Sequence, residues 1–231
     1  MALSGSMQDR AYEMLRTYIL NLVLQPGMSF TIQEMADRME VSRTPVREAL
    51  IRLQKDALVT FTSQRCTLVT QINLKRVEQE RFMREKLEIA VVDEFMQTDC
   101  HEFIPRLEGL MERQQSIAEN GTAEALVQLD DEFHSVFYEA AGQSLTWEML
   151  GQYNTHYRRV RLLNLHHKDM RGIVSEHQEL VRTICDGNRE KATHLIRMHL
   201  HKLDDEVRGL RMEYPDYFEQ DEKPYNPYRL I

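Results

Sequence analysis

The sequence predicts a mainly α-helical protein, in which an N-terminal winged helix-turn-helix precedes a C-terminal antiparallel all-helical bundle. Two observations predict it. Up to residue 72, three short helical patterns are followed by two β-rich pieces. Beyond that point, long amphipathic patterns follow one another, with breaks at glycine or asparagine and no strand between them. We therefore expect domains at 7–72 and 73–212 and a C-terminal tail at 213–231.

The N-terminal elements follow from their start and stop signals. They are expected at 8–22, 31–40 and 42–56 for the helices, and at 57–62 and 67–71 for the strands. Pro26 and Gly27 suit the two central positions of a tight turn between the first two helices. Thr31 and Glu34 have the spacing of a capping box. Ser42 can cap the third helix. This order, helices and then a hairpin, is typical of the winged helix-turn-helix.

The second half contains helical patterns only. They are expected near 75–98, 101–119, 122–141, 144–165, 170–186 and 189–210. Gly121, Gly142 and Gly187 can end helices, and Thr122 and Asn188 can cap the next ones. The tail from Tyr214 onward contains three prolines and is expected to be extended and packed on the surface, or partly disordered.

Composition excludes several classes of protein. With 231 residues, 42% of them hydrophobic, the chain can form one large or two small cores. We find no apolar run long enough to cross a bilayer and no export signal, and residues 1–6, which look like a leader, are left out of the fold prediction. Cys66, Cys100 and Cys185 lack paired spacing, which favours free thiols. We expect a cytoplasmic protein without membrane partners.

Charge is distributed unevenly between the two halves. Residues 1–72 hold eight Lys or Arg against seven Asp or Glu, a net charge of +1. Since the whole chain has a net charge of −8, the remaining residues have a net charge of −9. An acidic body would be repelled by phosphate groups. If the protein binds nucleic acid, the N-terminal domain must make the contact, most effectively with two copies presented together.

The third helix has the residues of a DNA-recognition helix. Arg43 and Arg47 are four residues apart and share one face. An arginine can bind the O6/N7 edge of guanine with both arms of its guanidinium group, while Thr44 and the helix start can contact phosphate. The other reading is an ordinary solvated arginine face. The hairpin that follows the helices favours the DNA-binding reading.

The N-terminal domain resembles the DNA-binding domain of the GntR family over residues 8–71. The resemblance rests on Leu24-Gln-Pro-Gly-Met, on Glu34-Met-Ala-Asp-Arg-Met-Glu-Val followed by Ser-Arg-Thr-Pro-Val-Arg-Glu-Ala-Leu, and on Leu53-Gln-Lys-Asp-Ala-Leu-Val. It implies that Arg43, Thr44 and Arg47 contact operator DNA, with Ser42 and the wing's Arg65 as further candidates. The family's wing usually has glycine after its basic residue, whereas here Arg65 is followed by cysteine.

Three histidines and one aspartate occupy positions where apolar residues are expected. Asp130 and His134 are four residues apart, on a helix face that also carries phenylalanines. His177 and His199 each interrupt an apolar stripe of their own helix. Buried polar groups need partners, so the set is unusual even though any single one is more easily read as a core histidine. The other histidines have no consistent partner: His101, His156, His166, His167, His194 and His201.

Helix geometry predicts that His177 and His199 meet. Both lie 11 residues from Asn188, at the turn between their helices. In an antiparallel hairpin they would therefore stand at the same height, about 16 Å from the turn. Three imidazoles and one carboxylate suit Zn²⁺, Ni²⁺ or Mn²⁺ with positions left open for water or a ligand. We therefore expect a metal site at Asp130, His134, His177 and His199.

Residues from about 75 to 210 resemble the all-helical, FCD-type ligand-binding domain of the FadR-type branch of the GntR family. In that domain an Asp-x-x-x-His helix, a Glu-His pair and a late His-Leu supply a metal site, matched here by Asp130 to His134, Glu176-His177 and His199-Leu200. Asp131 is the fallback ligand. Branch members that bind fatty acyl-CoA lack the metal set, which argues against that ligand here.

Arg84 matches an arginine early in that domain and is a candidate contact for an effector carboxylate. Its alternative role is a surface ion pair with Glu88, four residues further along the helix.

The sequence thus predicts a homodimeric DNA-binding transcription regulator, expected to be a repressor, that binds a divalent metal and a small organic acid. One alternative is a regulator that senses the metal itself. A second is a metal-dependent hydrolase, with Glu176 as a conceivable base, although no general base stands at a fixed spacing. We therefore expect that the protein is not an enzyme.

Overall fold

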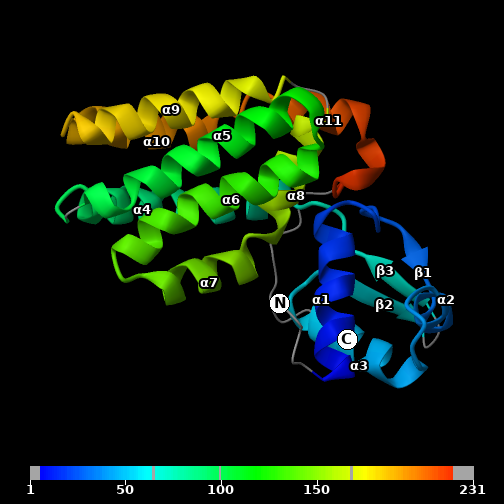
Figure 1. Ribbon diagram of the computed structural model, residues 1–231. Coiled ribbons are helices and arrows are strands. Elements are labelled where there is room, and N and C mark those ends of the chain that lie inside the picture. Colours follow the sequence, from blue (N-terminus) through cyan, green and yellow to red (C-terminus); the bar gives the residue numbers. More distant parts are fainter. Residues whose placement is uncertain (1–5, 64–65, 99, 167–168, 221–231) are drawn as a thin grey trace. The chain divides into compact units, whose positions relative to one another are not determined.

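The chain forms two compact units in the computed structural model, which describes residues 6–63, 66–98, 100–166 and 169–220 (Figure 1). One unit contains the residues up to Arg76 together with those from Arg211 onward, and the other is Val77–Leu210. The chain passes between the units twice, within a helix each time. A search of the described helices for one with the length and apolar character of a membrane span finds none.

The first unit has the helices and the hairpin expected of a winged helix-turn-helix. Its elements are α1 (Met7–Leu20), β1 (Ser29–Phe30), α2 (Ile32–Arg38), α3 (Arg43–Lys55), β2 (Val59–Ser63) and β3 (Cys66–Val69). The three strands form one antiparallel sheet in the order β1-β3-β2. The sequence did not predict β1, because two residues are too short to show an alternating pattern.

Local signals account for the way in which α1 leads into α2. Met28 N–H donates to Gln25 O across 3.0 Å, and Gly27 has φ +80°, as the third residue of a type II turn requires. Thr31 and Glu34 form the expected capping box, with bonds of 3.1 and 2.6 Å. Ser42 precedes α3 as expected but makes no side-chain capping bond, so that part of the prediction was wrong.

The second unit is helical throughout its described residues. Its elements are α4 (Leu74–Phe95), the 3₁₀ helix η1 (Cys100–Glu102), α5 (Ile104–Asn120), α6 (Ala123–Ala140), α7 (Ser144–Tyr153), α8 (Thr155–Leu165), α9 (Arg171–Cys185), α10 (Arg189–His201) and α11 (Val207–Glu213). In Figure 1, α5 lies beside both α6 and α9, and α9 lies beside α10. Gly142 and Gly187 take the positive φ values, 68° and 69°, that end the preceding helices.

Two of the expected long helices are each broken in the structure. The pattern at 144–165 forms α7 and α8, with the break at Asn154. The pattern at 189–210 ends at His201, and a turn precedes α11. Helical periodicity continues across a short break, so the hydrophobic pattern alone does not reveal either one.

The described part of the tail is ordered against the first unit. Pro215–Tyr217 form the 3₁₀ helix η2, and Phe218 pairs with Ile72 in a parallel bridge. Residues 214–220 are thus packed against this unit, as expected, although 215–217 form a helical turn and are not extended. Residues 221–231 lie outside the described part of the chain.

Candidate metal centre and DNA-binding helix

The four expected metal ligands lie together in the second unit. Asp130 and His134 come from α6, His177 from α9 and His199 from α10. One ligand atom from each residue can be chosen so that all four lie within 4.8 Å of one another. Asp130, His134 and His177 are buried, while His199 remains 13% exposed. Among the described residues, no second group of this kind occurs.

The three imidazoles present the same nitrogen to the same carboxylate. Nε2 of His177 lies 3.5 Å from Oδ1 of Asp130, and Nε2 of His199 lies 3.7 Å from that same oxygen. Nε2 of His134 lies 3.8 Å from Oδ2. These distances exceed hydrogen-bond length but leave the donor atoms around a common centre.

The other nitrogen of each ring faces an oxygen acceptor. Nδ1 of His177 forms a hydrogen bond of 2.9 Å with Gln114 Oε1, and Nδ1 of His199 one of 2.8 Å with Glu176 Oε2. Nδ1 of His134 lies 3.0 Å from Glu88 Oε2, although this contact lacks hydrogen-bond geometry. A proton on Nδ1 would leave the Nε2 lone pair directed to the centre. Metal-binding histidines are generally held in this way.

The residues present fit a divalent transition metal. Nε2 of both His134 and His177 is buried without a hydrogen-bond partner in the described part of the protein. Such nitrogens are costly unless something binds them. Three nitrogen donors and one carboxylate oxygen are a ligand set typical of Zn²⁺ and similar ions.

Burial and neighbouring charges set the protonation of the cluster. Burial lowers the pKa of His134 and holds the pKa of His177 well below the usual range, so both rings are neutral. Burial acts in the same direction on His199, but contacts with Asp130 and Glu176 raise its pKa to about 9. For Asp130, burial opposes ionisation, yet Arg161 and the histidines hold its pKa well below the ordinary value. The carboxylate is therefore ionised.

Arg84 forms the expected pair with Glu88, but in the interior and not on the surface. Its Nε donates to Glu88 Oε1 across 2.6 Å, and both side chains are 1% exposed. A second guanidinium nitrogen lies 3.6 Å from Asp130 Oδ2. Burial by itself would raise the pKa of Glu88, but Arg84 and His134 lower it to about 2. Arg84 therefore supports the cluster through its contacts with Glu88 and Asp130.

Asp131, the fallback ligand, lies outside the ligand group and pairs with arginines of α8. It accepts hydrogen bonds from Arg158 and, across 2.9 Å, from Arg161. Arg161 also donates to Asp130 and so contacts both carboxylates. The sequence reasoning missed Arg161, since its partners lie about 30 positions away along the chain.

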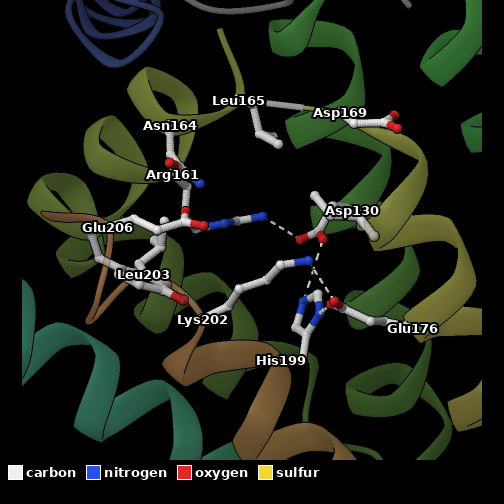
Figure 2. A pocket seen from close by; sticks show the side chains of 12 residues that line it. Asp130, Arg161, Asn164, Leu165, Asp169, Glu176, His199, Lys202, Leu203 and Glu206 are labelled. Atoms are coloured by element: carbon white, nitrogen blue, oxygen red, sulfur yellow. Dashed lines mark hydrogen bonds and ion pairs between the residues drawn. The ribbon is translucent and has the colours of Figure 1, made fainter. Parts of the chain in front are cut away.

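A cavity of about 260 Å³ reaches the cluster from the side of Asp130 and His199. Figure 2 shows Arg161 directed to Asp130 and Lys202 directed to Glu176, the latter pair at 2.6 Å. Leu165, Ile173 and Leu203 supply apolar walls. Neither His134 nor Arg84 lines this cavity. A small ligand would therefore meet Asp130 and His199 first.

The recognition-helix candidates are exposed, as contact with DNA requires. Ser42, Arg43, Thr44 and Arg47 are all exposed, whereas the opposite stripe of α3 is fully buried: Val46, Ala49, Leu50 and Leu53. Arg65 lies outside the described residues.

The helix α3 is fixed against α1 by a polar cluster. Arg52 lies over the ring of Tyr12, 3.9 Å from its centroid, and pairs with Asp9 across 2.7 Å. The Tyr12 hydroxyl donates to Asp56 across 2.7 Å. Burial, together with Asp56, raises the pKa of Tyr12 to about 12. These contacts hold the exposed arginine face in one orientation within its unit.

Two family models match the chain, one before residue 70 and one after residue 80, on either side of the boundary at Arg76 between the two units. Residues 7–69 match the family "Bacterial regulatory proteins, gntR family", and residues 81–202 match the "FCD domain". Residues 203–220 lie outside both matches.

Relatives found by sequence and by structure are regulators. The chain is 25% identical over 214 residues to the HTH-type transcriptional repressor RspR of Escherichia coli, covering 92% of this chain and 94% of the relative. It is 29% identical over 215 residues to a HTH-type transcriptional regulator of Streptomyces ambofaciens, covering 91% and 89%. The fold is similar to that of E. coli McbR, with a TM-score of 0.76, 18% identity and coverage of 91% and 99%. The family matches and the sequence relatives are those of transcription regulators and not of enzymes.

Proposed function

The chain belongs to the GntR family of bacterial transcription regulators and carries an FCD effector-binding domain. We propose that it is a repressor controlled by a small organic acid that binds beside a divalent metal. Its two activities reside in different units. The α3 face would bind the operator, and the cluster around Asp130 would bind the metal and the acid.

DNA binding is assigned to Arg43, Thr44 and Arg47, with Ser42 at the helix start and Arg65 in the wing. Ser42 makes no capping bond, so its hydroxyl is available to a phosphate. Arg43 and Arg47 would read base edges or phosphates in the major groove. A homodimer would place two α3 helices in successive major grooves, about 34 Å apart. A protein that binds chromosomal DNA in this way works in the cytoplasm.

The metal is assigned to Asp130, His134, His177 and His199, with Zn²⁺, Ni²⁺ or Mn²⁺ as the ions that suit these donors. A bound ion would supply open coordination positions for a carboxylate oxygen. Glu88, Gln114 and Glu176 would orient the rings through Nδ1. Glu88 itself is held by Arg84, which gives Arg84 an indirect role.

The effector is assigned to the cavity beside Asp130 and His199. Its volume of about 260 Å³ suits a small acid, since it lies just below the range of about 300–1,000 Å³ typical of pockets for larger ligands. Arg161 and Lys202 would attract its carboxylate. Regulation requires that the acid bind two arrangements of the DNA-binding domains unequally, with a coupling of typically 1–3 kcal/mol.

The observation that carries this proposal is the pair of buried, unpartnered Nε2 atoms in the described cluster. Metal content and melting temperature would be measured for the wild type, for His134→Ala with His177→Ala, and for the control His194→Ala on the exposed face of α10. We expect about one metal per chain, lost only in the double variant, and a higher wild-type melting temperature with one acid of a panel.

Other outcomes separate the alternatives. No metal in any protein, and none taken up when supplied, would overturn the site. If the affinity for the operator depended on the metal and did not change with any acid of the panel, a metal sensor would be favoured instead.

A further inference from the structure

The segment after α11 returns to the first unit and binds the junction between the wing and α4. Ile72 N–H donates to Tyr217 O across 2.7 Å, and Glu219 N–H donates to Ile72 O across 3.0 Å. Both backbone groups of Ile72 are therefore used by residues 214–220, which we call the strap. Phe218 anchors it, since its side chain is 1% exposed.

The strap also holds the residue that caps α4. Asn73 Oδ1 accepts a hydrogen bond from the N–H of Arg76 across 2.9 Å, as an N-cap residue does. The amide nitrogen of the same Asn73 donates to Glu219 Oε2 across 2.6 Å. A movement of Glu219 would therefore act directly on the start of the helix that leads into the effector domain.

A third contact joins the strap to the turn before β1. Asp216 O accepts a hydrogen bond from Gln71 Nε2 across 2.9 Å. It also lies 3.2 Å from the place where Gly27 would carry a Cβ, at a glycine with φ +80°. Any side chain at Gly27 would crowd the strap and would strain the turn. The turn and the strap are thus fitted to each other.

One short helix joins the start of the strap to the wall of the effector cavity. Lys202, Leu203 and Glu206 line that cavity, and only α11, Val207–Glu213, separates them from the strap. Lys202 is tied to α9 by its 2.6 Å contact with Glu176. A ligand that changed this contact would move the end of the chain that leads into α11.

We propose that the strap transmits the state of the effector cavity to the junction at residues 71–73, in addition to the direct connection through α4. This inference rests on the proposed effector function for its biological meaning, but not for its test. It concerns a part of the chain that neither family match covers. By linkage, the coupling is reciprocal, so loosening the strap must also loosen the cavity wall.

Amide hydrogen exchange of the full-length protein tests the strap directly. Phe218→Ala removes the anchor, Glu219→Ala removes only the bond to Asn73, and Asp216→Ala is the matched control because only its backbone oxygen is used. We expect exchange in peptides covering 70–76 and 202–213 to accelerate about tenfold or more in Phe218→Ala, less in Glu219→Ala and not in the control. Unchanged exchange in 202–213 in folded Phe218→Ala would overturn the coupling.

Zn²⁺ alone serves as the probe of transmission. We expect it to slow exchange in 195–206 of every variant, and to alter exchange in 70–76 of the wild type and Asp216→Ala but not of Phe218→Ala. An equal response of 70–76 in Phe218→Ala would overturn the strap. No response of 195–206 in any protein would contradict the metal proposal instead, and the metal-free comparison would still decide the strap.

Discussion

Gln114 accepts a hydrogen bond from Nδ1 of His177 across 2.9 Å, and its own amide nitrogen donates to Leu129 O across 3.1 Å. The second bond fixes which end of the Gln114 amide faces the ring. His177 must then carry its proton on Nδ1, which leaves the Nε2 lone pair 3.5 Å from the Asp130 carboxylate. A lone pair facing a carboxylate is unfavourable unless a cation lies between them. The Gln114 amide thus leaves the Nε2 lone pair of His177 directed to the proposed metal position.

Gln114→Leu should weaken metal binding about 10- to 100-fold, because the neutral ring loses the acceptor that fixes its tautomer. The matched control is Gln115→Leu, on the same helix, whose side chain bonds Glu119 instead. Competition with a chelator of known affinity would measure the dissociation constants. Equal affinity in the two variants would show that Gln114 does not orient the ligand.

Arg84→Gln should destabilise the effector domain by about 3–5 kcal/mol, since it leaves Glu88 buried without its cation, whereas Asp130 keeps Arg161. Arg113→Gln is the comparison: it breaks an exposed pair with Glu132, 61% and 39% exposed, and should cost at most about 1 kcal/mol. Urea unfolding of the metal-free proteins measures both. A loss of only about 1 kcal/mol in Arg84→Gln would contradict a supporting role for this arginine.

Glu80→Ala should destabilise the protein by about 2 kcal/mol, because Glu80 caps α8 from another helix. Its buried carboxylate accepts the N–H groups of His156 and Tyr157 across 2.8 and 2.9 Å. Glu80→Gln keeps an acceptor oxygen and should lose less. Thermal unfolding of the three proteins would give the order, and an equal loss in both variants would indicate that charge rather than capping matters.

The break before α8 is a feature that could not be predicted from the sequence. Glu80 lies 76 residues from His156, so no local pattern reports that a carboxylate caps a helix there. His156 was expected at a surface or helix-end position. It is at the start of a helix but buried.

The candidate metal ligands could be predicted from the sequence because the position of each depends on one helix or one hairpin. Asp130 and His134 share a face through helical spacing, and His177 and His199 face each other across one turn, with ring centroids 5.0 Å apart. The ring-orienting partners depend on packing between distant segments. Gln114 did leave a signal, since it interrupts the buried face of Leu107, Leu110 and Met111.

Arg47→Ala should weaken operator binding by about 1–3 kcal/mol, roughly 5- to 150-fold, because an exposed guanidinium on the recognition face is lost. Lys55→Ala, in the last turn of the same helix, is the matched control and should bind almost as the wild type does. The operator would be selected from a pool of random DNA fragments. Fluorescence anisotropy at several salt concentrations would then measure the affinity of each protein for it. A loss equal to that of the control would remove Arg47 from the interface.

Glu85 should make stability depend on pH in the acid range. Burial opposes its ionisation, but Lys86, His201 and Arg197 together lower its pKa to about 2. A carboxylate whose pKa is lower in the folded than in the unfolded chain stabilises the fold above about pH 4.5 and loses that contribution as pH falls towards 2. The full shift of the pKa would correspond to about 3 kcal/mol of stability, but Lys86 and Arg197 are half exposed, so we expect about 1 kcal/mol.

Urea unfolding at pH 5 and pH 3 should show Glu85→Gln less stable than wild type at pH 5 and closer to it at pH 3. A constant difference would mean that packing of the side chain, and not its charge, is what Glu85 contributes.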